Sequence, residues 1–501
     1  MSPAKISLSS KSGETITDYL KNAGLLVETA YINGQWIKTP ADQVITVTNP
    51  FDGSVIGTVP SLDQKAVTDA IDGAEAAFAK WSQLLPHQRA QKLRIWGELM
   101  LAEREDLGLI MTLEQGKPLA ESMGEIDYAA SFFDWFAGVA ERNALVGITP
   151  HLARASMVTV REPVGICALI TPWNFPSAMI TRKAAAALAV GCTVVVKPAS
   201  ETPFSALALA VLAEKAGIPK GVFNVVTGKS AVIAKTMCDD VRVRALSFTG
   251  STKVGRLLLK WASPLVKKVS MELGGHAPFI VFEDVDIDHA VQGAIAAKFQ
   301  TSGQDCLAAN RIYIHHDILD EFIKRFTKAV GELKVGDGME PGTEIGPLMN
   351  DGSVNKCIEH VQDAIRKGAV LHVGGKVHSL GKLFFQPTVL APMTPDMLIA
   401  NEETFGPVAA ITGFSREEDV IKLANATEYG LAAYVYTKNG ARAARMAGAL
   451  EFGMIAINRV KMTGGPVPFG GVKQSGLGRE GGEFGMDAFS NIKFICSSLE
   501  S

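Results

Sequence analysis

Short apolar runs alternate with longer helical segments between residues 164 and 282. Apolar residues at three- and four-residue intervals are typical of helices, whereas strands buried on both faces are continuous apolar runs. Their alternation predicts strand–helix–strand units, which build a parallel sheet with helices on both faces. The expected strands are 165–170, 193–197, 222–226, 245–248 and 279–282, and the expected helices include 204–216 and 252–262.

The flanking regions predict more elements of the same α/β class. Apolar residues recur at helical spacing from Val67 to Phe78, and Ser61 with Gln64 matches the capping-box pattern that opens a helix. The glycine-rich stretch 464–485 predicts a long ordered loop of the kind that lines a site. A second alternation predicts a helix at 319–333, strands near 408–412 and 454–457, and a last strand at 492–496 that is a candidate for pairing with another subunit.

Length and composition narrow the function classes. A chain of 501 residues exceeds a single core and predicts two or three domains. With 49 basic and 52 acidic residues it lacks the basic excess of a nucleic-acid binder. The apolar stretch between Lys183 and Lys197 is too short to span a bilayer, and the N-terminus has no apolar signal region, so we expect a cytoplasmic protein. Its six cysteines form no C-x-x-C pair and no zinc-like cluster, which predicts reduced thiols and no metal.

Four positions carry candidate chemistry, and each alone has a simpler interpretation. Gly250 ends an apolar run and opens a helical one, as in a phosphate site or an ordinary strand–helix turn. Cys306 is a candidate nucleophile, although a lone cysteine is usually an inert core residue. Glu272 precedes two glycines, where a capping or salt-bridge role is the simpler interpretation, and Asn174 by itself is a turn residue.

Taken together, these positions resemble one family in order and spacing, the aldehyde dehydrogenase superfamily, and within it the succinate-semialdehyde dehydrogenases. The resemblance runs from about residue 30 to the C-terminus. It implies a Rossmann-like cofactor domain (1–145 and 164–272), an α/β catalytic domain (273–475) and a small β oligomerisation element (146–163 and 476–501) in a homodimer or homotetramer. The blocks that carry it are TPWNFP, KPAS, FTGS, MELGG, GQDC, EETFGPV and PFGGVKQSGLGREG.

The resemblance implies a thioester mechanism. The Cys306 thiolate would attack the aldehyde carbon, and the Asn174 side-chain amide with the Cys306 backbone N–H would stabilise the oxyanion. Glu272 would activate the water that hydrolyses the thioester. Lys183 and Glu480 match the residues that carry the released proton outward.

The same resemblance implies an NAD(P) site. Lys197 would bind the adenosine ribose, Gly250 and Ser251 would flank the pyrophosphate, and Glu403 would bind the nicotinamide ribose with Phe405 packing beside the ring. The cofactor block also includes Thr171, Pro172 and Trp173.

The choice between the two nucleotides turns on Ser200. Members that prefer NAD often have a glutamate three residues after the lysine, and here that residue is Ser200. A hydroxyl does not repel a 2′-phosphate as a carboxylate does, which favours NADP. The adjacent Glu201 weakens this preference and keeps NAD open as the alternative.

The substrate residues match the semialdehyde enzymes only in part. Arg182 and Thr463 match an arginine and a hydroxyl that bind the substrate carboxylate, but Gln300 replaces the second arginine. Arg459 and Lys461 add positive charge to the same loop, unless both point to solvent. The expected substrate is a small anionic aldehyde: succinate semialdehyde, a related or longer semialdehyde, or an aromatic or sulfonated one.

Two other functions are compatible with parts of the pattern. A CoA-acylating dehydrogenase would resolve the thioester with CoA, but such members generally lack the glutamate found here as Glu272. A non-catalytic structural relative would have no reason to keep the candidate residues together. Absorbance at 340 nm with aldehyde and cofactor, with and without CoA, separates these alternatives.

Overall fold

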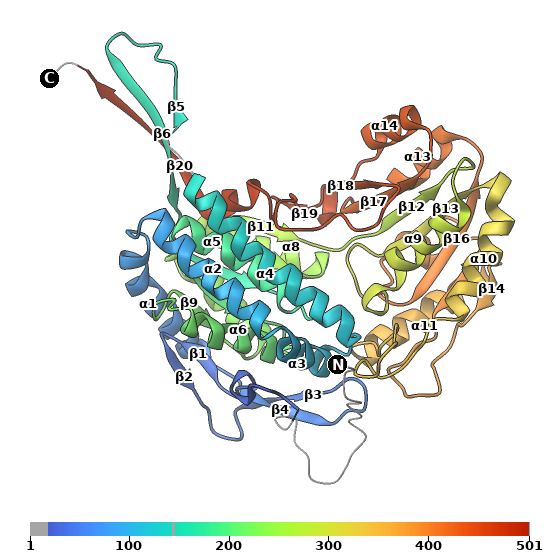
Figure 1. Cartoon of the computed structure of the whole chain (residues 1–501), viewed down its shortest axis with the longest axis horizontal. Helices are drawn as coiled ribbons and strands as arrows, with labels where there is room; N and C mark the ends of the chain where they lie inside the picture. Colours follow the sequence, from blue (N-terminus) through green and yellow to red (C-terminus); the bar gives the residue numbers. More distant parts are fainter. Residues whose placement is uncertain (1–18, 143–145, 500–501) are drawn as a thin grey trace.

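A computed structural model describes residues 19–142 and 146–499. The remaining residues (1–18, 143–145 and 500–501) are at the ends of two predicted domain segments and lie outside the described ranges. In Figure 1 the part predicted to be the cofactor domain lies on the left and the part predicted to be the catalytic domain lies on the right, and we keep these names for the two parts. A thin arm projects from the left-hand part. The α/β class predicted from the sequence is confirmed. None of the described helices is long and apolar enough to cross a bilayer.

The cofactor domain is built on a mostly parallel sheet. Parallel pairing joins β11, β10, β7, β8 and β9, and β1 and β19 add antiparallel strands at opposite ends of this series. In spatial order the strands are β19 (Gly476–Leu477), β11 (Lys268–Glu272), β10 (Val243–Thr249), β7 (Ile166–Ile170), β8 (Thr193–Lys197), β9 (Phe223–Val225), β1 (Ala30–Ile32) and β2 (Gln35–Ile37). A separate hairpin pairs β3 (Val44–Thr48) with β4 (Val55–Pro60).

Helices cover both faces of this sheet because alternate strand residues point to opposite sides. Cys167 and Leu169 of β7 pack into one core, and Ala168 and Ile170 into the other. One face carries α2 (Pro86–Ala102), α3 (Arg104–Gln115), α4 (Leu119–Arg142), α5 (Ala178–Val190) and α6 (Pro203–Lys215). The other carries α1 (Gln64–Trp81), α7 (Ser230–Asp239) and α8 (Thr252–Ala262).

One predicted helix start is wrong. Helix α1 begins at Gln64, and its N-cap is Asp63, whose carboxylate accepts a hydrogen bond from the Ala66 N–H at 2.9 Å. The predicted capping box of Ser61 and Gln64 therefore does not form. Ser61 instead donates its N–H to the Gln43 carbonyl, which continues the pairing of the β3–β4 hairpin.

The catalytic domain has a second mostly parallel sheet. Its strands, in spatial order, are β14 (Val370–Val373), β15 (Thr388–Ala391), β16 (Val408–Phe414), β13 (Ala309–His315), β12 (Ala277–Val281), β17 (Ala432–Tyr436) and β18 (Met454–Ile457). The helices α9 (Ile287–Phe299) and α10 (Leu319–Gly331) cover one face. The other face carries α11 (Asp351–Arg366), α12 (Leu398–Asn401), α13 (Glu417–Asn425) and α14 (Gly440–Ala449).

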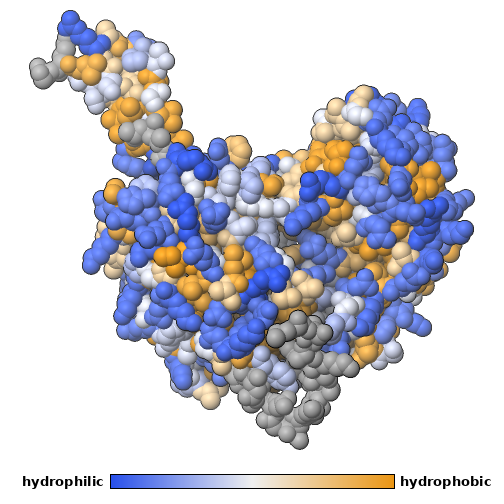
Figure 2. Space-filling model, in the orientation of Figure 1, coloured by the Kyte–Doolittle hydropathy of each residue, from blue (hydrophilic) through white to orange (hydrophobic). Residues whose placement is uncertain are grey.

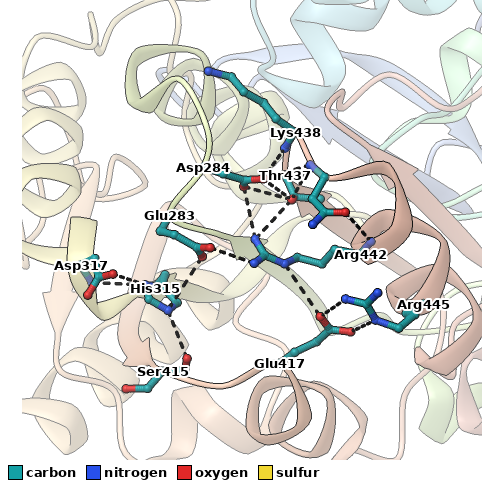
Figure 3. A network of polar contacts seen from close by, with 11 residues as sticks. Glu283, Asp284, His315, Asp317, Ser415, Glu417, Thr437, Lys438, Arg442 and Arg445 are labelled. Carbon is teal, nitrogen blue, oxygen red and sulfur yellow. Dashed lines mark hydrogen bonds and ion pairs between the residues drawn. The ribbon is translucent and has the colours of Figure 1, made fainter.

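A network of polar contacts closes the carboxyl ends of the catalytic strands (Figure 3). Arg442 donates to Glu283 at 2.8 Å, lies 3.4 Å from Asp284 and packs 4.4 Å from the centre of the Phe282 ring. Asp284 accepts hydrogen bonds from the residues that follow β17, beginning with the Thr437 hydroxyl at 2.9 Å. Open α/β sheets usually bind ligands at this end. Here the protein's own charges occupy it.

The arm is a three-stranded antiparallel sheet made of β5 (Val146–Gly147), β6 (Ala155–Pro163) and β20 (Ser490–Ser498). The last strand pairs with β6 over all nine of its residues. Apolar side chains are visible on the arm in Figure 2, and Ile492 and Phe494 are 71% and 54% exposed. These segments lie within the predicted oligomerisation element, whereas β19, predicted with them, pairs with β11 of the cofactor sheet.

Candidate active site

The predicted cofactor residues lie at the carboxyl ends of parallel strands. Lys197 ends β8 in register with Ile170, the last residue of β7, and Thr249 ends β10 in register with Glu272, the last residue of β11. The strand order reverses direction between β7 and β10. This switch point is where open α/β sheets bind nucleotides.

Several groups around the switch point suit a dinucleotide. The Lys197 ammonium group donates to the Ser230 hydroxyl at 2.7 Å, and burial lowers its pKa to about 8. Ser251 caps the N-terminus of α8 by accepting the Val254 N–H at 3.4 Å, and Gly250 precedes it. The Thr171 hydroxyl is buried without a hydrogen-bond partner among the described residues. An anion-binding helix end, a cation and an unpaired hydroxyl together fit the phosphates and ribose of NAD(P).

The nicotinamide end of this site is predicted around Glu403 and Phe405. Glu403 accepts the Gly275 N–H at 3.0 Å, and burial raises the pKa of its carboxyl to about 7. The Phe405 ring meets Trp173 edge-on at 5.6 Å, and its φ of 56° is unusual for a residue with a side chain. Pro172 and Ser200 are both half-buried, each in the loop that follows its strand.

Cys306 lies just before β13, at the amino end of the catalytic sheet, and Asn174 from the other sheet contacts the loop that carries it. The Asn174 side-chain amide donates to the carbonyl of Gln304, two residues before the cysteine, at 3.1 Å. Gly275 allows the Cys306 backbone to lie close to the segment between β11 and β12, because a Cβ atom there would lie 2.0 Å from the Cys306 carbonyl oxygen. Burial raises the pKa of the Cys306 thiol well above its ordinary value, and Asp305 adds to the shift.

The loop that presents Cys306 has a strained backbone. Thr301 and Ser302 have φ values of 50° and 56°, a region that residues with side chains rarely adopt. Glu121 of α4 stabilises this conformation by accepting the Thr301 N–H at 2.8 Å and its hydroxyl at 3.1 Å. Glu121 therefore helps to set the position of the cysteine loop.

Glu272 is buried, and neither of its carboxylate oxygens has a hydrogen-bond partner among the described residues. Burial raises its pKa well above the ordinary value, and the charge of Glu480 raises it further. An unpaired carboxylate with a raised pKa is a stronger base than an ordinary carboxylate, which suits it to accept a proton.

Lys183, Arg182 and Glu480 form a buried ionic cluster beside Glu272. The Glu480 carboxylate accepts one hydrogen bond from the Lys183 ammonium group and one from the Arg182 guanidinium group. Lys183 also donates to the Thr249 hydroxyl at 2.6 Å. Burial alone would raise the pKa of Glu480, but the charges of Lys183 and Arg182 outweigh it and lower that pKa.

A cavity of about 570 Å³ opens beside Cys306. The predicted substrate residues Arg182, Gln300, Lys461 and Thr463 all line it. Arg459, the fifth, is exposed and is not among the described residues that form the lining. A shallower hollow of about 420 Å³ beside Lys268 and Arg479 shares no lining residue with this cavity among the described residues.

The sequence interpretation missed a group of residues behind the site: Lys117, Glu121, Glu125 and Tyr128. The last three occupy positions i, i+4 and i+7 of α4, so they lie on one face of the helix. All three line the cavity. Their spacing is the signal that could have identified them, although polar residues on one face of a helix usually indicate a surface in contact with solvent.

Comparisons with known proteins identify the family and the fold. A family model described as the aldehyde dehydrogenase family matches residues 36–495. The chain is 52% identical to an aspartate-semialdehyde dehydrogenase (non-phosphorylating) of Halomonas elongata, over 96% of this chain and 98% of that one. It is 48% identical to the succinate-semialdehyde dehydrogenase [NADP(+)] of Escherichia coli, over 96% and 100%. A crystal structure of an aldehyde dehydrogenase from Brucella melitensis biovar abortus superposes with a TM-score of 0.95 at 51% identity, covering 96% and 99%.

Proposed function

Since this chain belongs to the aldehyde dehydrogenase family, we propose that it oxidises an anionic semialdehyde to the carboxylic acid, with NAD(P) as the hydride acceptor and a thioester on Cys306 as the intermediate. One observation carries the proposal. Cys306 lies in a cavity lined by Arg182 and Lys461, so the candidate nucleophile and two cationic side chains face the same space.

In the first step the Cys306 thiol loses its proton to Glu272, and its sulfur attacks the carbonyl carbon of the aldehyde. The C=O electron pair moves to oxygen, and the Asn174 side-chain amide and the Cys306 N–H donate hydrogen bonds to this oxyanion. When bound, NAD(P) supplies the acceptor for the hydride that leaves the carbon, and this loss yields the thioester.

In the second step Glu272, deprotonated again, takes a proton from water while the water oxygen attacks the thioester carbon. The C–S bond breaks and the acid is released, and the proton that Glu272 took from water returns to the sulfur, so that Cys306 regains its thiol. The ion pair of Lys183 and Glu480 receives the proton that Glu272 must lose between steps. Its burial next to Glu272 supports this role.

We assign NADP as the preferred nucleotide, with NAD as the alternative. The half-buried Ser200 follows Lys197 by three residues and brings no negative charge to the 2′ position of the ribose. Glu201 is exposed, and its charge is the feature that favours NAD. We further propose that the apolar arm joins copies of the chain into a homodimer or homotetramer.

The cavity favours an anionic substrate but not one particular chain length. Arg182 is fully buried and already binds Glu480, and Lys461 is exposed. The cavity therefore lacks the pair of arginines expected for succinate semialdehyde. A second candidate is an aldehyde that also carries an ammonium group. Glu121 lines the same cavity with a carboxyl group whose pKa burial raises to about 7.

Steady-state kinetics tests the proposal. The panel contains succinate, glutarate and aspartate semialdehydes and neutral aldehydes of equal length, each with NAD and NADP, with and without CoA. We expect kcat/KM for the best anionic aldehyde to exceed that of its neutral analogue at least about tenfold, the scale of one charged contact. A neutral aldehyde that is oxidised equally well would contradict the anionic class, and full activity of Cys306→Ala would contradict the mechanism.

A further inference from the structure

A buried ion pair binds the backbone that carries Asn174. The Lys117 ammonium group donates to the Glu125 carboxylate at 2.7 Å and to the Asn174 carbonyl oxygen at 2.5 Å. Both charged side chains are only 1% exposed. The same ammonium group lies 4.1 Å from the centre of the Phe175 ring, which lines the cavity. Lys117 therefore contacts two consecutive residues of the loop that holds the candidate oxyanion donor.

Glu125 extends this contact to helix α5. Its second carboxylate oxygen accepts the Ser177 N–H at 2.9 Å and the Ala178 N–H at 3.0 Å, at the N-terminus of the helix. Arg182 and Lys183 lie one turn farther along α5. A single carboxylate thus connects the loop of the oxyanion donor to the helix that carries the ionic cluster.

Asn174 is held at two atoms. Lys117 binds its carbonyl oxygen, and its side-chain amide donates one N–H to the Gln304 carbonyl at 3.1 Å. The second N–H of the amide remains for the oxyanion. An oxyanion donor is effective only within about 2.7–3.1 Å of the developing charge, so a small rotation of the 174 peptide removes its effect.

We propose that Lys117 and Glu125 are positioning residues, which hold the Asn174 amide at the distance that the oxyanion requires. The inference rests on the proposed function, in which Asn174 stabilises that oxyanion. Neither residue touches the reacting atoms. Glu125 also caps α5, so the effect that passes through Asn174 has to be separated from any effect on that helix.

The chain offers a matched control in Glu114 of α3. Glu114 is fully buried and caps a helix in the same way, accepting the Phe204 and Ser205 N–H groups of α6 at 2.8 Å each. It is not among the described residues that line the cavity. Glu114→Gln therefore reports the cost of disturbing a buried helix cap without disturbing Asn174.

The experiment is a double-mutant cycle between the ion pair and Asn174. Lys117→Met/Glu125→Gln removes both charges together, because removing one partner would leave the other buried and uncompensated. We expect this variant to lose kcat about a hundredfold, as when one oxyanion donor is lost. In the Asn174→Ala background the same change should cost less than about threefold, because the two sites act through one group. KM for the aldehyde and the Kd of NADP should change little, and Glu114→Gln should keep kcat.

Each outcome of the cycle supports or overturns either the positioning role or the proposed mechanism. Equal losses in both backgrounds would overturn the positioning role, since the pair would then act independently of Asn174. Unchanged kcat in Asn174→Ala would instead overturn the proposed mechanism. If the charge-free variant fails to bind NADP, Lys117→Gln/Glu125→Gln serves in the same cycle, because it also leaves no buried charge and its two amides can pair with each other. Additive losses there would equally overturn the inference.

Discussion

Lys183 and Glu480, which are 297 residues apart in the sequence, form a buried ion pair next to Glu272. Arg182 binds the second oxygen of the same carboxylate. The negative charge of Glu480 raises the pKa of Glu272, whereas the two positive charges lower it. The protonation of Glu272 therefore depends on the balance within this cluster.

This balance predicts the effect of Glu480→Gln on the pH dependence. Glu272 acts as a base only when deprotonated, so kcat in the native enzyme should rise as the pH increases through its raised pKa. The substitution removes the negative neighbour and leaves both positive ones, so the pKa of Glu272 should fall. The acidic limb of the kcat–pH profile should then move to lower pH. Glu483→Gln, at an exposed residue nearby, should not move it, and a shift to higher pH in Glu480→Gln would contradict the assignment.

Substitutions of Lys461 and Arg459 are expected to have different effects on activity, although both residues lie in one loop. Lys461 lines the cavity and Arg459 is exposed outside the lining. Lys461→Met should lower kcat/KM for the best anionic semialdehyde about tenfold and leave neutral aldehydes unchanged, because one charged contact is lost. Arg459→Met, the matched control, should stay within about twofold, as expected for a screened surface charge. Equal losses in both variants would show that the charge acts at long range.

Ser200→Glu tests the nucleotide assignment. A carboxylate here should repel a 2′-phosphate and accept the 2′-hydroxyl of NAD. The ratio of kcat/KM for NADP to that for NAD should fall at least about tenfold, the scale of one close like-charge contact. Glu201→Gln should move the same ratio slightly toward NADP. An unchanged ratio in Ser200→Glu would place the 2′ position elsewhere.

A substitution in the network of Figure 3 is expected to lower the stability of the protein without lowering its activity. Arg442→Met leaves the carboxylates of Glu283, Asp284 and Glu417 without their shared cation. These groups are partly exposed, so solvent screening limits the cost to about 1–3 kcal/mol. Arg445→Met removes a more exposed partner of Glu417 and should cost under about 1 kcal/mol. Thermal denaturation should show a lower Tm for Arg442→Met, and a large fall in kcat would mean that this end of the sheet affects the chemistry.

Hydrophobic patterning predicted the strands well because buried parallel strands leave a local signal. The strand at 193–197 has the bounds expected, and that at 165–170 begins one residue later, at Ile166. The start of α1 was wrong because two polar residues near the helix end competed for the N-cap, and spacing alone did not decide between Ser61 and Asp63. Nothing in the local sequence indicates that Asn174 and Cys306 lie in one site. Only the family resemblance predicted it.

The site residues that the sequence did not predict lie in segments without a periodic pattern or depend on the tertiary fold. The substrate loop has no repeating pattern, so the sequence could not separate Lys461, which lines the cavity, from the exposed Arg459. Lys117 and Glu125 resemble ordinary surface charges in sequence, and only the tertiary fold buries them against each other. Such long-range pairing of charges has no local signature.

At Gly275 the backbone of the segment between β11 and β12 lies directly against the backbone of the Cys306 loop. The chain crosses from β11 to β12 through this residue, and the Cys306 carbonyl oxygen occupies the place of its missing side chain. Contact between two backbones is stiffer than contact between side chains, which can change rotamer to relieve pressure. One added methyl group at this residue would therefore push the Cys306 backbone away from the segment between β11 and β12, with no side chain there to absorb the change.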